Sequence, residues 1–447
     1  MERKPAIFIS IASYRDPELI PTLQDLIGKS SGRYRLAIAV CWQDEGDRQC
    51  FLQAGMTLCA AESTKAYETL TWRYLDTEIQ VISLHYFFSK GACWARNLCE
   101  TLYRQQDYFL QIDSHCRFCA SWDSEMVTML EQLKTHSERP VLSSYPAGYI
   151  PGKEEEKSQL VTRMIFRGFS ADKLLQLTSV DFQQPMPVRG SYLAGGFIFA
   201  DGRFVEDVPN DPQIFFEGEE IAMAARAFTH GYDVWHPHKT LLWHFYGREE
   251  AMRIWGDHNE EAKKSGTVEQ AWYERDSLSK KRVRMLLGID QAGQKELETL
   301  GRYGLGSRRT LAEFEATLGI SFARLAVLPA VLGPEHIAWF PPPHAENWRK
   351  KLVSPMKKEV RLTQEEFATP LAGIACLHVG IYDSRNDLLY KKILLKKEIS
   401  TKLAASDGQA IAVTLEVSLP VRFAPDVVRF SAWDDEEGWS NVVEKAW

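Results

Sequence analysis

The sequence predicts an α/β domain followed by a small antiparallel β-sandwich, and three observations support that fold class. The chain has 447 residues, enough for one large domain and one or two smaller ones. Short apolar runs alternate with helical patterns over its first half, which favours a mostly parallel sheet flanked by helices. Beyond about Glu359, short runs of period two follow one another between turn residues, a pattern typical of antiparallel sheets.

The elements of the α/β domain follow in order from that alternation. Strands are expected at 6–13, 35–42, 78–84, 108–113 and 140–145, and helices at 18–29, 91–105 and 121–136. Ligands of such sheets bind beyond the carboxyl ends of the strands. The polar residues at these ends are therefore candidates for the site: Ser13, Tyr14 and Arg15, then Gln43 and Asp44, then Asp113, Ser114 and His115.

The later segments depart from simple alternation. Strands are expected at 161–169 and 192–199, and helices at 219–230, 269–287 and 311–319. Three consecutive prolines from Pro341 mark a boundary, because they continue neither a helix nor a central strand. The predicted organisation is a domain over 1–340 with a helical extension from about 250, a linker over 341–358 and the β-sandwich over 359–447.

The β-sandwich is expected to have strands at 374–382, 388–395, 410–417 and 427–433. Its Trp433 and Trp439 are expected to be core aromatics, with stacking on sugar rings as the alternative.

The composition argues against several classes of protein. Apolar residues make up 45% and charged residues 25% of a chain with net charge −7, which offers no electrostatic reason to bind nucleic acid or an anionic membrane. No apolar run approaches the roughly 18–20 residues that span a bilayer, and the run at 7–11 is too short for a signal peptide. Seven of the eight cysteines lie between Cys41 and Cys119, and no second Cys-x-x-Cys pair is present to complete a four-thiolate zinc site. We therefore expect reduced thiols and a cytoplasmic location.

Asp113 and His115 form the pattern with the clearest chemistry. They end a buried strand at positions i and i+2, so in an extended chain their side chains point to the same side. An oxygen and nitrogen donor set with open positions suits Mn²⁺ or Mg²⁺ bridging a diphosphate. The alternative is that Asp113 caps the following helix.

A third metal ligand has to come from a distant segment. His244 lies among aromatic and apolar residues and is followed by Arg248, whose guanidinium suits a phosphate. His236 and His238 compete for the role, and a hydrogen-bonded core histidine is the structural alternative for His244.

Ordered sequence strings carry a resemblance to a known family. They cover about residues 5 to 320 and leave the C-terminal hundred residues outside the match. The strings are Ile9-Ser-Ile-Ala-Ser-Tyr-Arg-Asp16, Gly91-Ala-Cys-Trp-Ala-Arg-Asn97, Gln111-Ile-Asp-Ser-His-Cys-Arg-Phe118 with Trp122-Asp123, Leu193-Ala-Gly-Gly-Phe197, Phe216-Glu-Gly-Glu-Glu-Ile221, Phe228-Thr-His-Gly-Tyr-Asp233 and Tyr303-Gly-Leu-Gly-Ser-Arg-Arg-Thr-Leu311. The chain resembles the GlcNAc-transferases whose founding members modify hydroxyproline on a cytoplasmic ubiquitin-ligase adaptor.

The resemblance implies a GT-A fold, a UDP-sugar donor (UDP-GlcNAc first), a divalent metal and retention of the anomeric configuration. By carry-over, Asp113 and His115 are the metal pair and His244 is the third ligand. The pair Asp-x-His in place of the commoner Asp-x-Asp leaves the choice between Mn²⁺ and Mg²⁺ to be tested.

Donor-binding roles are expected for residues at the strand ends and in the next helix. Ser13, Tyr14 and Arg15 are expected to hold uridine, with a polar turn before Pro17 as the alternative. Asp44 is expected to contact the uracil or ribose. Arg96 and Asn97 lie about one helical turn inside the helix expected at 91–105, and Arg96 reaches the nucleotide or the metal-binding aspartate unless it is a solvated helix arginine. The donor set also includes Ser114, Glu217 and Arg248.

The sugar side is expected at Gly195-Gly196 and at an acidic cluster. The two glycines let the backbone approach the donor sugar closely, and a β-bulge is the alternative. Glu219 or Glu220 is expected to bind sugar hydroxyls, although helix-dipole complementarity explains part of the cluster. With Arg96 they form the catalytic set, and no nucleophile is assigned because the leaving phosphate can take the acceptor proton.

The favoured function is therefore a metal-dependent, retaining transferase that moves GlcNAc from UDP-GlcNAc to a hydroxyl group on a protein or glycan. The alternatives are a transferase using UDP-galactose or UDP-GalNAc, a UDP-sugar hydrolase, and a non-catalytic protein that binds UDP-sugars or glycans. The expected partners are the donor and the acceptor, without nucleic acid or a membrane span.

Overall fold

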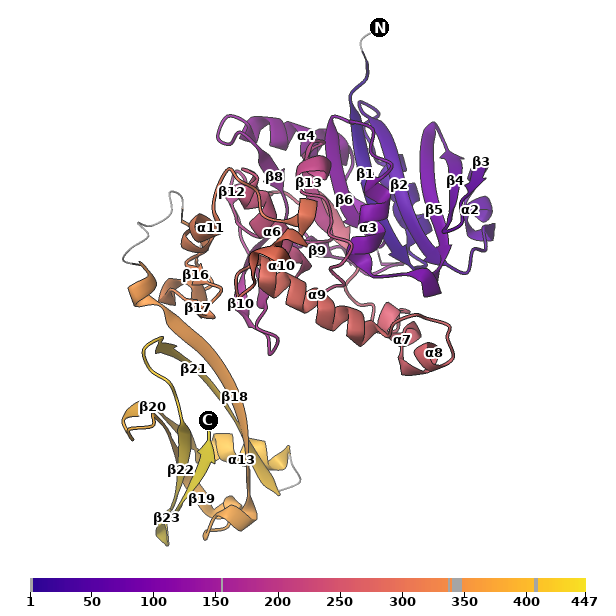
Figure 1. Cartoon of the computed structure of the whole chain (residues 1–447). Helices are drawn as coiled ribbons and strands as arrows, with labels where there is room; N and C mark the ends of the chain where they lie inside the picture. Colours follow the sequence, from indigo (N-terminus) through magenta and orange to yellow (C-terminus); the bar gives the residue numbers. More distant parts are fainter. Residues whose placement is uncertain (1–2, 154–155, 337, 340–347, 406–408) are drawn as a thin grey trace. The chain divides into compact units, whose positions relative to one another are not determined.

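A mixed sheet organises the first part of the chain in the computed structural model, which describes residues 3–153, 156–336, 338–339, 348–405 and 409–447. Within the described residues the sheet has ten strands in the order β12-β14-β8-β13-β6-β1-β2-β5-β4-β3. Its parallel centre consists of β6 (Tyr108–Asp113), β1 (Ala6–Tyr14), β2 (Arg35–Asp44) and β5 (Thr77–His85). Figure 1 shows these four strands side by side.

Antiparallel strands extend the sheet on both sides. They are β4 (Glu68–Tyr74) and β3 (Thr57–Ser63) beyond β5, and β13 (Phe197–Asp201), β8 (Pro140–Leu142), β14 (Asp233–His236) and β12 (Val188–Arg189) beyond β6. The pair β8–β14 is parallel. The sequence patterns missed β3 and β4. The edge strand β3 exposes most of its residues and so has no apolar alternation. β4 lies between β3 and β5 and buries Leu70 and Trp72, an alternation that the sequence interpretation did not use.

The centre of the sheet is buried on both faces. Ile7, Ile9 and Ile11 of β1 belong to the large core formed with α1 (Leu19–Gly28) and α4 (Trp122–Leu133). Phe8 points to the opposite face, where α3 (Ala92–Glu100) contacts β1 and β2. A strand covered on both faces needs a continuous apolar run, which is the pattern that β1 shows.

Register decides where these strands end. Ala12 of β1 pairs with Cys41 of β2 and with Asp113 of β6. The carboxyl ends of the three strands therefore meet at one edge, where their terminal polar residues face the same region.

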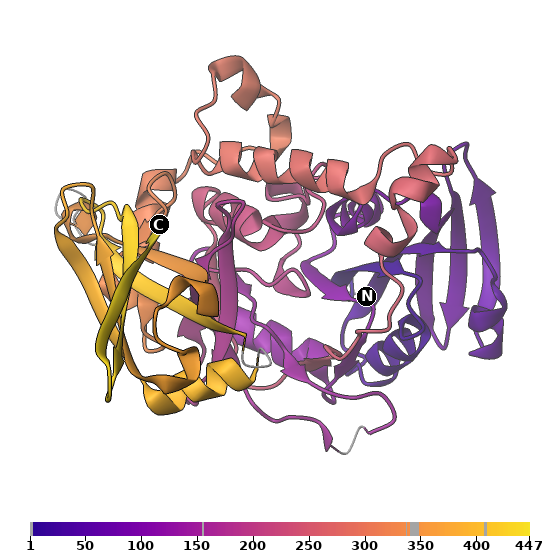
Figure 2. The same cartoon turned by 90° about the horizontal axis from the view of Figure 1, so that it is seen from below.

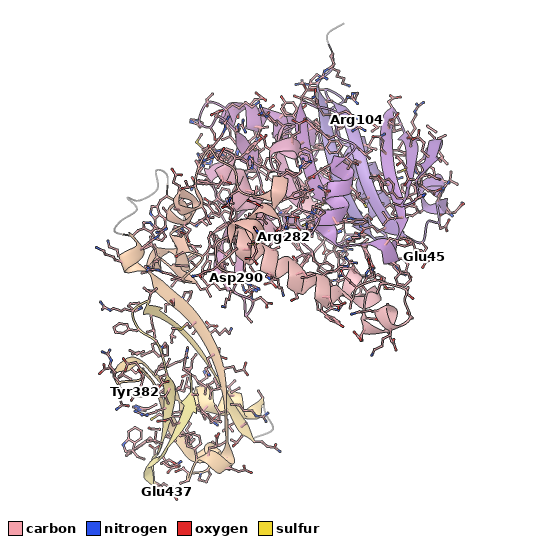
Figure 3. All side chains as sticks on the ribbon, viewed as in Figure 1. Glu45, Arg104, Arg282, Asp290, Tyr382 and Glu437 are labelled. Carbon is pink, nitrogen blue, oxygen red and sulfur yellow. The ribbon has the colours of Figure 1, made fainter. Side chains whose placement is uncertain are left out.

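A helical extension follows the sheet. It contains α7 (Ile254–Asp257), α8 (Glu260–Lys264), α9 (Trp272–Leu286), α10 (Gln294–Glu298) and α11 (Leu311–Leu318). Another helix, α6 (Glu219–Thr229), comes earlier, between β13 and β14. Figures 1 and 2 both show α9 running between α7 at one end and α10 near the other. Arg282 of α9, labelled in Figure 3, forms a buried ion pair of 2.6 Å with Asp211, which ties the helix to the loop before α6.

Smaller elements complete the first part of the chain. They are α2 (Gln49–Gln53), α5 (Phe204–Asp207), the hairpin β10 (Thr162–Phe169) and β11 (Leu175–Asp181), and a small sheet of β7 (Cys116–Phe118), β15 (Leu242–His244) and β9 (Ala147–Gly148). Gly195 and Gly196 form a turn before β13, so the strand expected over 192–199 begins later, at Phe197.

The second unit consists of 324–330 and 344–447. One of its sheets contains β17 (Ala326–Val327), β18 (Val353–Thr363) and β21 (Ala410–Pro420), and the other has the order β20 (Leu388–Leu395), β19 (Ile374–Tyr382), β22 (Val427–Asp434), β23 (Gly438–Ala446). Both sheets and α13 (Lys396–Ala404) contribute to one apolar core, as in a β-sandwich. The predicted fold class, an α/β domain followed by antiparallel sheets, is confirmed.

Two sequence expectations differ from this unit in detail. β18 begins at Val353, inside the range expected to be a linker, because Pro355, Lys357 and Lys358 interrupt the apolar alternation. Residues 341–347 of that range lie outside the described residues, and 348–352 precede the strand. Trp439 is 56% exposed and so is not the core aromatic that the pattern predicts.

Within the described residues, no helix has the length and apolarity that a bilayer crossing requires.

Candidate active site

A cavity of about 630 Å³ opens at the carboxyl ends of β1 and β6. Its walls come from the first unit alone, chiefly the strand ends, the start of α3, the turn before β13, the start of α6 and the segment after β15. The predicted site residues that line it are Tyr14, Arg96, Asp113, Ser114, His115, Gly195, Gly196, Glu217, Glu219, Glu220, His244 and Arg248.

Asp113, His115 and His244 bring three metal-ligand atoms together in this cavity. Nε2 of His244 lies 3.1 Å from Oδ2 of Asp113 and 3.0 Å from Nε2 of His115. The distance between Oδ2 of Asp113 and Nε2 of His115 is 3.9 Å. Adjacent ligands of an octahedral ion with bonds of about 2.1 Å are about 3.0 Å apart, so the residues present fit a small divalent cation.

The small sheet explains how a histidine far along the chain joins the pair at the end of β6. His244 of β15 pairs with Cys116 of β7, the residue directly after His115. The backbone N–H of Phe245 also donates to the carbonyl of His115 at 3.0 Å. His236, which competed for this role, instead lies buried in β14 with Nδ1 2.6 Å from the carbonyl oxygen of Ser143.

The two histidines differ in their surroundings. Nδ1 of His115 lies 2.8 Å from Oδ2 of Asp16, a carboxylate partner typical of metal-binding histidines. Nδ1 of His244 is buried without a hydrogen-bond partner among the described residues. Burial lowers the pKa of His244, which favours the neutral imidazole that binds metals.

Arg96 organises the acidic side of the site. It is buried in the middle of α3, and its terminal nitrogens bind Oδ1 of Asp113 at 2.8 Å and Oε1 of Glu219. Burial alone would raise the pKa of Asp113, but the hydrogen bond from His244 and the charge of Arg96 hold it well below its usual range. Asp113 is therefore ionised at neutral pH, as a metal ligand must be.

Glu220 has a different environment from Glu219. Its Oε1 accepts a 3.0 Å hydrogen bond from the backbone N–H of Gly195, and its Oε2 accepts one from the hydroxyl of Tyr145. Burial, with the charge of Glu219 as a smaller contribution, raises the pKa of Glu220 to about 7 against the hydrogen bonds that lower it.

Gly195 and Gly196 are packed against this acidic cluster. A Cβ atom on Gly196 would lie 2.6 Å from Oδ2 of Asp113, and one on Gly195 would collide with Glu219. The glycines therefore let the backbone pass close to the site, and no larger side chain fits there without displacing an acidic group.

Tyr14 and Arg15 join the end of β1 to α7. The Tyr14 hydroxyl donates to Oδ2 of Asp257 at 2.8 Å, and Nη1 of Arg15 lies 3.0 Å from Oδ1 of the same residue. The Arg15 guanidinium also lies 4.1 Å from the ring centroid of Tyr86. Burial and the hydrogen bond to Asp257 raise the pKa of Tyr14, which stays a neutral donor.

Four predicted donor-binding residues do not line the cavity: Ser13, Arg15, Asp44 and Asn97. Successive residues of a strand point to opposite faces, so Tyr14 and Gln43 line the cavity whereas Ser13 and Asp44 point away from it.

Asn97 is one position past Arg96 on α3 and points elsewhere. Its amide donates to the carbonyl of Asn210 at 2.9 Å, a contact that holds the loop before α6. Figure 3 labels Glu45, which follows Asp44 at the end of β2 and lies 3.5 Å from Arg15.

Sequence reasoning missed Asp16 and Tyr145 as parts of the site. The local pattern assigns Asp16 to the turn before α1, and its Oδ1 does accept from the backbone N–H of Glu18 at 3.0 Å. Asp16 and His115 are 99 positions apart in the sequence, so no local pattern predicts their contact. The signal for Tyr145 was its place after β8, at the same edge of the sheet.

Comparisons with known proteins found one matching family and a similar solved structure. Residues 6–324 match the family described as glycosyltransferase (GlcNAc). Among solved structures, the chain is similar to one described as the crystal structure of GalNAc-T7 with UDP, GalNAc and Mn²⁺, at 13% identity and a TM-score of 0.42. That match covers 68% of this chain and 56% of the other, so the chain spans little more than half of its length. None of the curated proteins matches the chain.

Proposed function

The chain belongs to the glycosyltransferase (GlcNAc) family, and we propose that it transfers GlcNAc from UDP-GlcNAc to a hydroxyl acceptor with the help of a divalent cation. The convergence of Asp113, His115 and His244 in the cavity is the observation that carries the proposal. Family membership makes the protein a glycosyltransferase. The α/β domain, with an Asp-x-His pair ending the central strand β6, has the organisation that the GT-A prediction requires.

Asp113, His115 and His244 would hold Mn²⁺ or Mg²⁺. Such a cation supplies Lewis-acid neutralisation of the charge that develops on a leaving nucleotide diphosphate. The surrounding residues prepare these ligands for the cation. Asp16 keeps the proton of His115 on Nδ1, and Arg96 binds the Asp113 oxygen that faces away from the histidines.

The transfer that we propose is retaining, as the family resemblance implies, and uses no dedicated base. Both oxygens of Glu220 accept hydrogen bonds, from Gly195 and Tyr145, and Glu219 is paired with the guanidinium of Arg96. Carboxylates engaged in this way bind hydroxyl groups and orient them, while the leaving phosphate takes the acceptor proton. We therefore assign Glu219, Glu220 and Arg96 to sugar orientation and charge stabilisation.

The acceptor is a hydroxyl group on a protein side chain or a glycan, and we place the activity in the cytoplasm. All eight cysteines are free thiols, which supports a reducing compartment.

The test is UDP release from a panel of UDP-GlcNAc, UDP-GalNAc and UDP-galactose, each with Mn²⁺, Mg²⁺ or EDTA. We expect the highest rate with UDP-GlcNAc and loss of activity in EDTA. A preference for UDP-galactose would contradict the donor, and full activity in EDTA would contradict the metal. Mass spectrometry of a protein and glycan pool treated with labelled UDP-GlcNAc identifies the acceptor.

Two histidine variants provide a matched comparison. His115→Ala is expected to abolish metal-dependent donor binding while leaving the fold intact. His136→Ala removes an exposed histidine beyond α4 and is expected to retain the activity. Equal donor binding by both variants would contradict the ligand assignment.

A further inference from the structure

One carboxylate oxygen of Asp16 gathers three donors. Its Oδ2 lies 2.5 Å from Oγ of Ser114, 2.8 Å from Nδ1 of His115 and 3.0 Å from Nη2 of Arg248. The Asp16 side chain is 1% exposed, so these protein groups and not bulk water satisfy it. A carboxylate accepts hydrogen bonds and does not donate them, so the proton of neutral His115 sits on Nδ1 and its lone pair on Nε2.

That lone pair already has a partner. Nη1 of Arg248 lies 3.1 Å from Nε2 of His115, and because a guanidinium only donates, Nε2 is the acceptor. Nε2 of His244 lies 3.0 Å from the same atom, but its hydrogen also has the ionised carboxylate of Asp113 at 3.1 Å as an acceptor. An imidazole nitrogen has a single lone pair in the plane of the ring. Nε2 of His115 therefore cannot accept from Arg248 and bind a cation at the same time.

His244 lacks an equivalent arrangement. Its Nε2 faces Oδ2 of Asp113 at 3.1 Å and donates to it, while its Nδ1 has no partner among the described residues. To bind a cation through Nε2, His244 has to carry its proton on Nδ1 instead. Asp16 therefore fixes the tautomer of His115, whereas His244 has to change its tautomer before it can bind a cation.

The charges around the cluster are balanced by arginine. Asp16 and Asp113 are each paired with a guanidinium, from Arg248 and Arg96 respectively. A divalent cation would add positive charge beside Nε2 of His115, where Arg248 already supplies positive charge. Once Arg248 leaves Nε2, its charge remains in the cavity that the negatively charged diphosphate enters.

From these contacts we infer that Asp16 is a positioning residue for His115 and that Arg248 occupies Nε2 of His115 until a divalent cation displaces it. The inference rests on the proposed metal site and adds an order of events to it. Arg248 opposes binding of the cation alone and favours binding of cation and diphosphate together.

Mn²⁺ binding to the full chain without donor, followed by electron paramagnetic resonance, tests the role of Arg248. Arg248→Ala is expected to raise Mn²⁺ affinity about tenfold and to lower UDP affinity at saturating Mn²⁺ by about tenfold. Arg167→Ala is the control, since it removes an exposed arginine of β10 that also lines the cavity. It is expected to change Mn²⁺ affinity less than twofold.

Unchanged Mn²⁺ affinity in Arg248→Ala, with Mn²⁺ binding by the unaltered chain, overturns this inference and leaves the proposed function standing. An equal rise in Arg167→Ala also overturns it, because the effect would then be one of general charge. Absence of Mn²⁺ binding from all variants overturns both the inference and the proposed metal.

The role of Asp16 is tested by Asp16→Asn, with circular dichroism and thermal unfolding to verify the fold. Mn²⁺ affinity is expected to fall by about 10-fold to 100-fold, as for other residues that orient metal-binding histidines. Nitrogen-15 spectra of labelled histidine in the cation-free protein report the tautomer, with His115→Ala to assign the signal. A folded Asp16→Asn variant that keeps the Nδ1–H tautomer and the original Mn²⁺ affinity overturns the role.

Discussion

Arg96 and Asp113 form an ion pair in which Nη2 lies 2.8 Å from Oδ1, leaving Oδ2 of the aspartate directed at the two histidines. The arginine thereby decides which carboxylate oxygen is available to a cation. Its other terminal nitrogen binds Glu219, so one buried side chain links the metal ligands to the acidic side of the cavity.

Arg96→Ala is expected to impair both stability and activity. It leaves two carboxylates near each other without their shared partner, and removing one partner of a buried ion pair costs about 3–5 kcal/mol. Arg96→Lys keeps the charge but cannot bridge both acids in the same way, so an intermediate loss is expected. Chemical unfolding and UDP release provide the measurements. A fully stable and active Arg96→Ala variant would contradict the role.

Gly196→Ala is expected to damage the metal site without a large loss of stability. The added Cβ would lie 2.6 Å from Oδ2 of Asp113 and has to displace the carboxylate. Displacement of a catalytic group by about 1 Å costs on the order of 100-fold in rate, so a similar loss of UDP release is expected. Gly168→Ala is the control, because its Cβ would meet nothing within 4 Å. Equal rates for the two variants would refute the packing argument.

Stability is expected to depend on pH through Glu100 and Glu220. Burial raises the pKa of each to about 7, against 4.5 for an unperturbed glutamate. Between these values the folded state binds more protons than the unfolded state, so each group makes the free energy of unfolding fall as pH rises from about 5 to 7. Buried histidines such as His236, whose pKa is lowered to about 4, act in the opposite direction over part of this range.

A variant comparison isolates the glutamate contribution. Relative to the unaltered chain, Glu100→Gln is expected to gain on the order of 1–3 kcal/mol of stability between pH 5 and pH 7.5. Urea unfolding at the two pH values measures that difference. A difference that does not change with pH would show that Glu100 titrates normally.

Asp257→Asn is expected to weaken donor binding. Asp257 accepts from both Tyr14 and Arg15 and so attaches α7 to the end of β1, beside the cavity. Loss of the Asp257 charge weakens its contacts with Tyr14 and Arg15, so Tyr14 is held less firmly at the cavity. KM for the donor is therefore expected to rise severalfold, with a smaller change in kcat. The control is Asp290→Asn, which removes a 2.8 Å ion pair with Arg284 at the far end of α9 (Figure 3). Equal KM values in the two variants would argue against a role for this attachment.

The sequence predicted the central strands because they are buried on both faces. β6 has the predicted bounds, and β1, β2 and β5 differ from prediction by one or two residues at their ends. The edge strand β3 was missed because most of its residues are exposed and show no apolar pattern. β4 was also missed, although its Leu70 and Trp72 alternate as buried residues.

Residues close together in the sequence also allowed part of the site, Asp113 and His115, to be predicted. Asp113 and His115 are two residues apart, and the two-residue period of a β-strand predicts that they share one side. In the structure β6 ends at Asp113 and a bend follows, so Ser114 lines the cavity as well as His115. The same period, applied one step further, accounts for Ser13 and Asp44 pointing away from the cavity that Tyr14 and Gln43 line.

By itself, the sequence determined the α/β class, the edge of the sheet that holds the site and the Asp113–His115 pair, because local periodicity and strand order fix all three. Only the tertiary structure brought Asp16 to Nδ1 of His115, Arg96 to Asp113, and Arg248 to the nitrogen that a cation would bind. Those contacts depend on the sheet register and on the pairing of β15 with β7, and such long-range pairings leave no local trace in the order of residues.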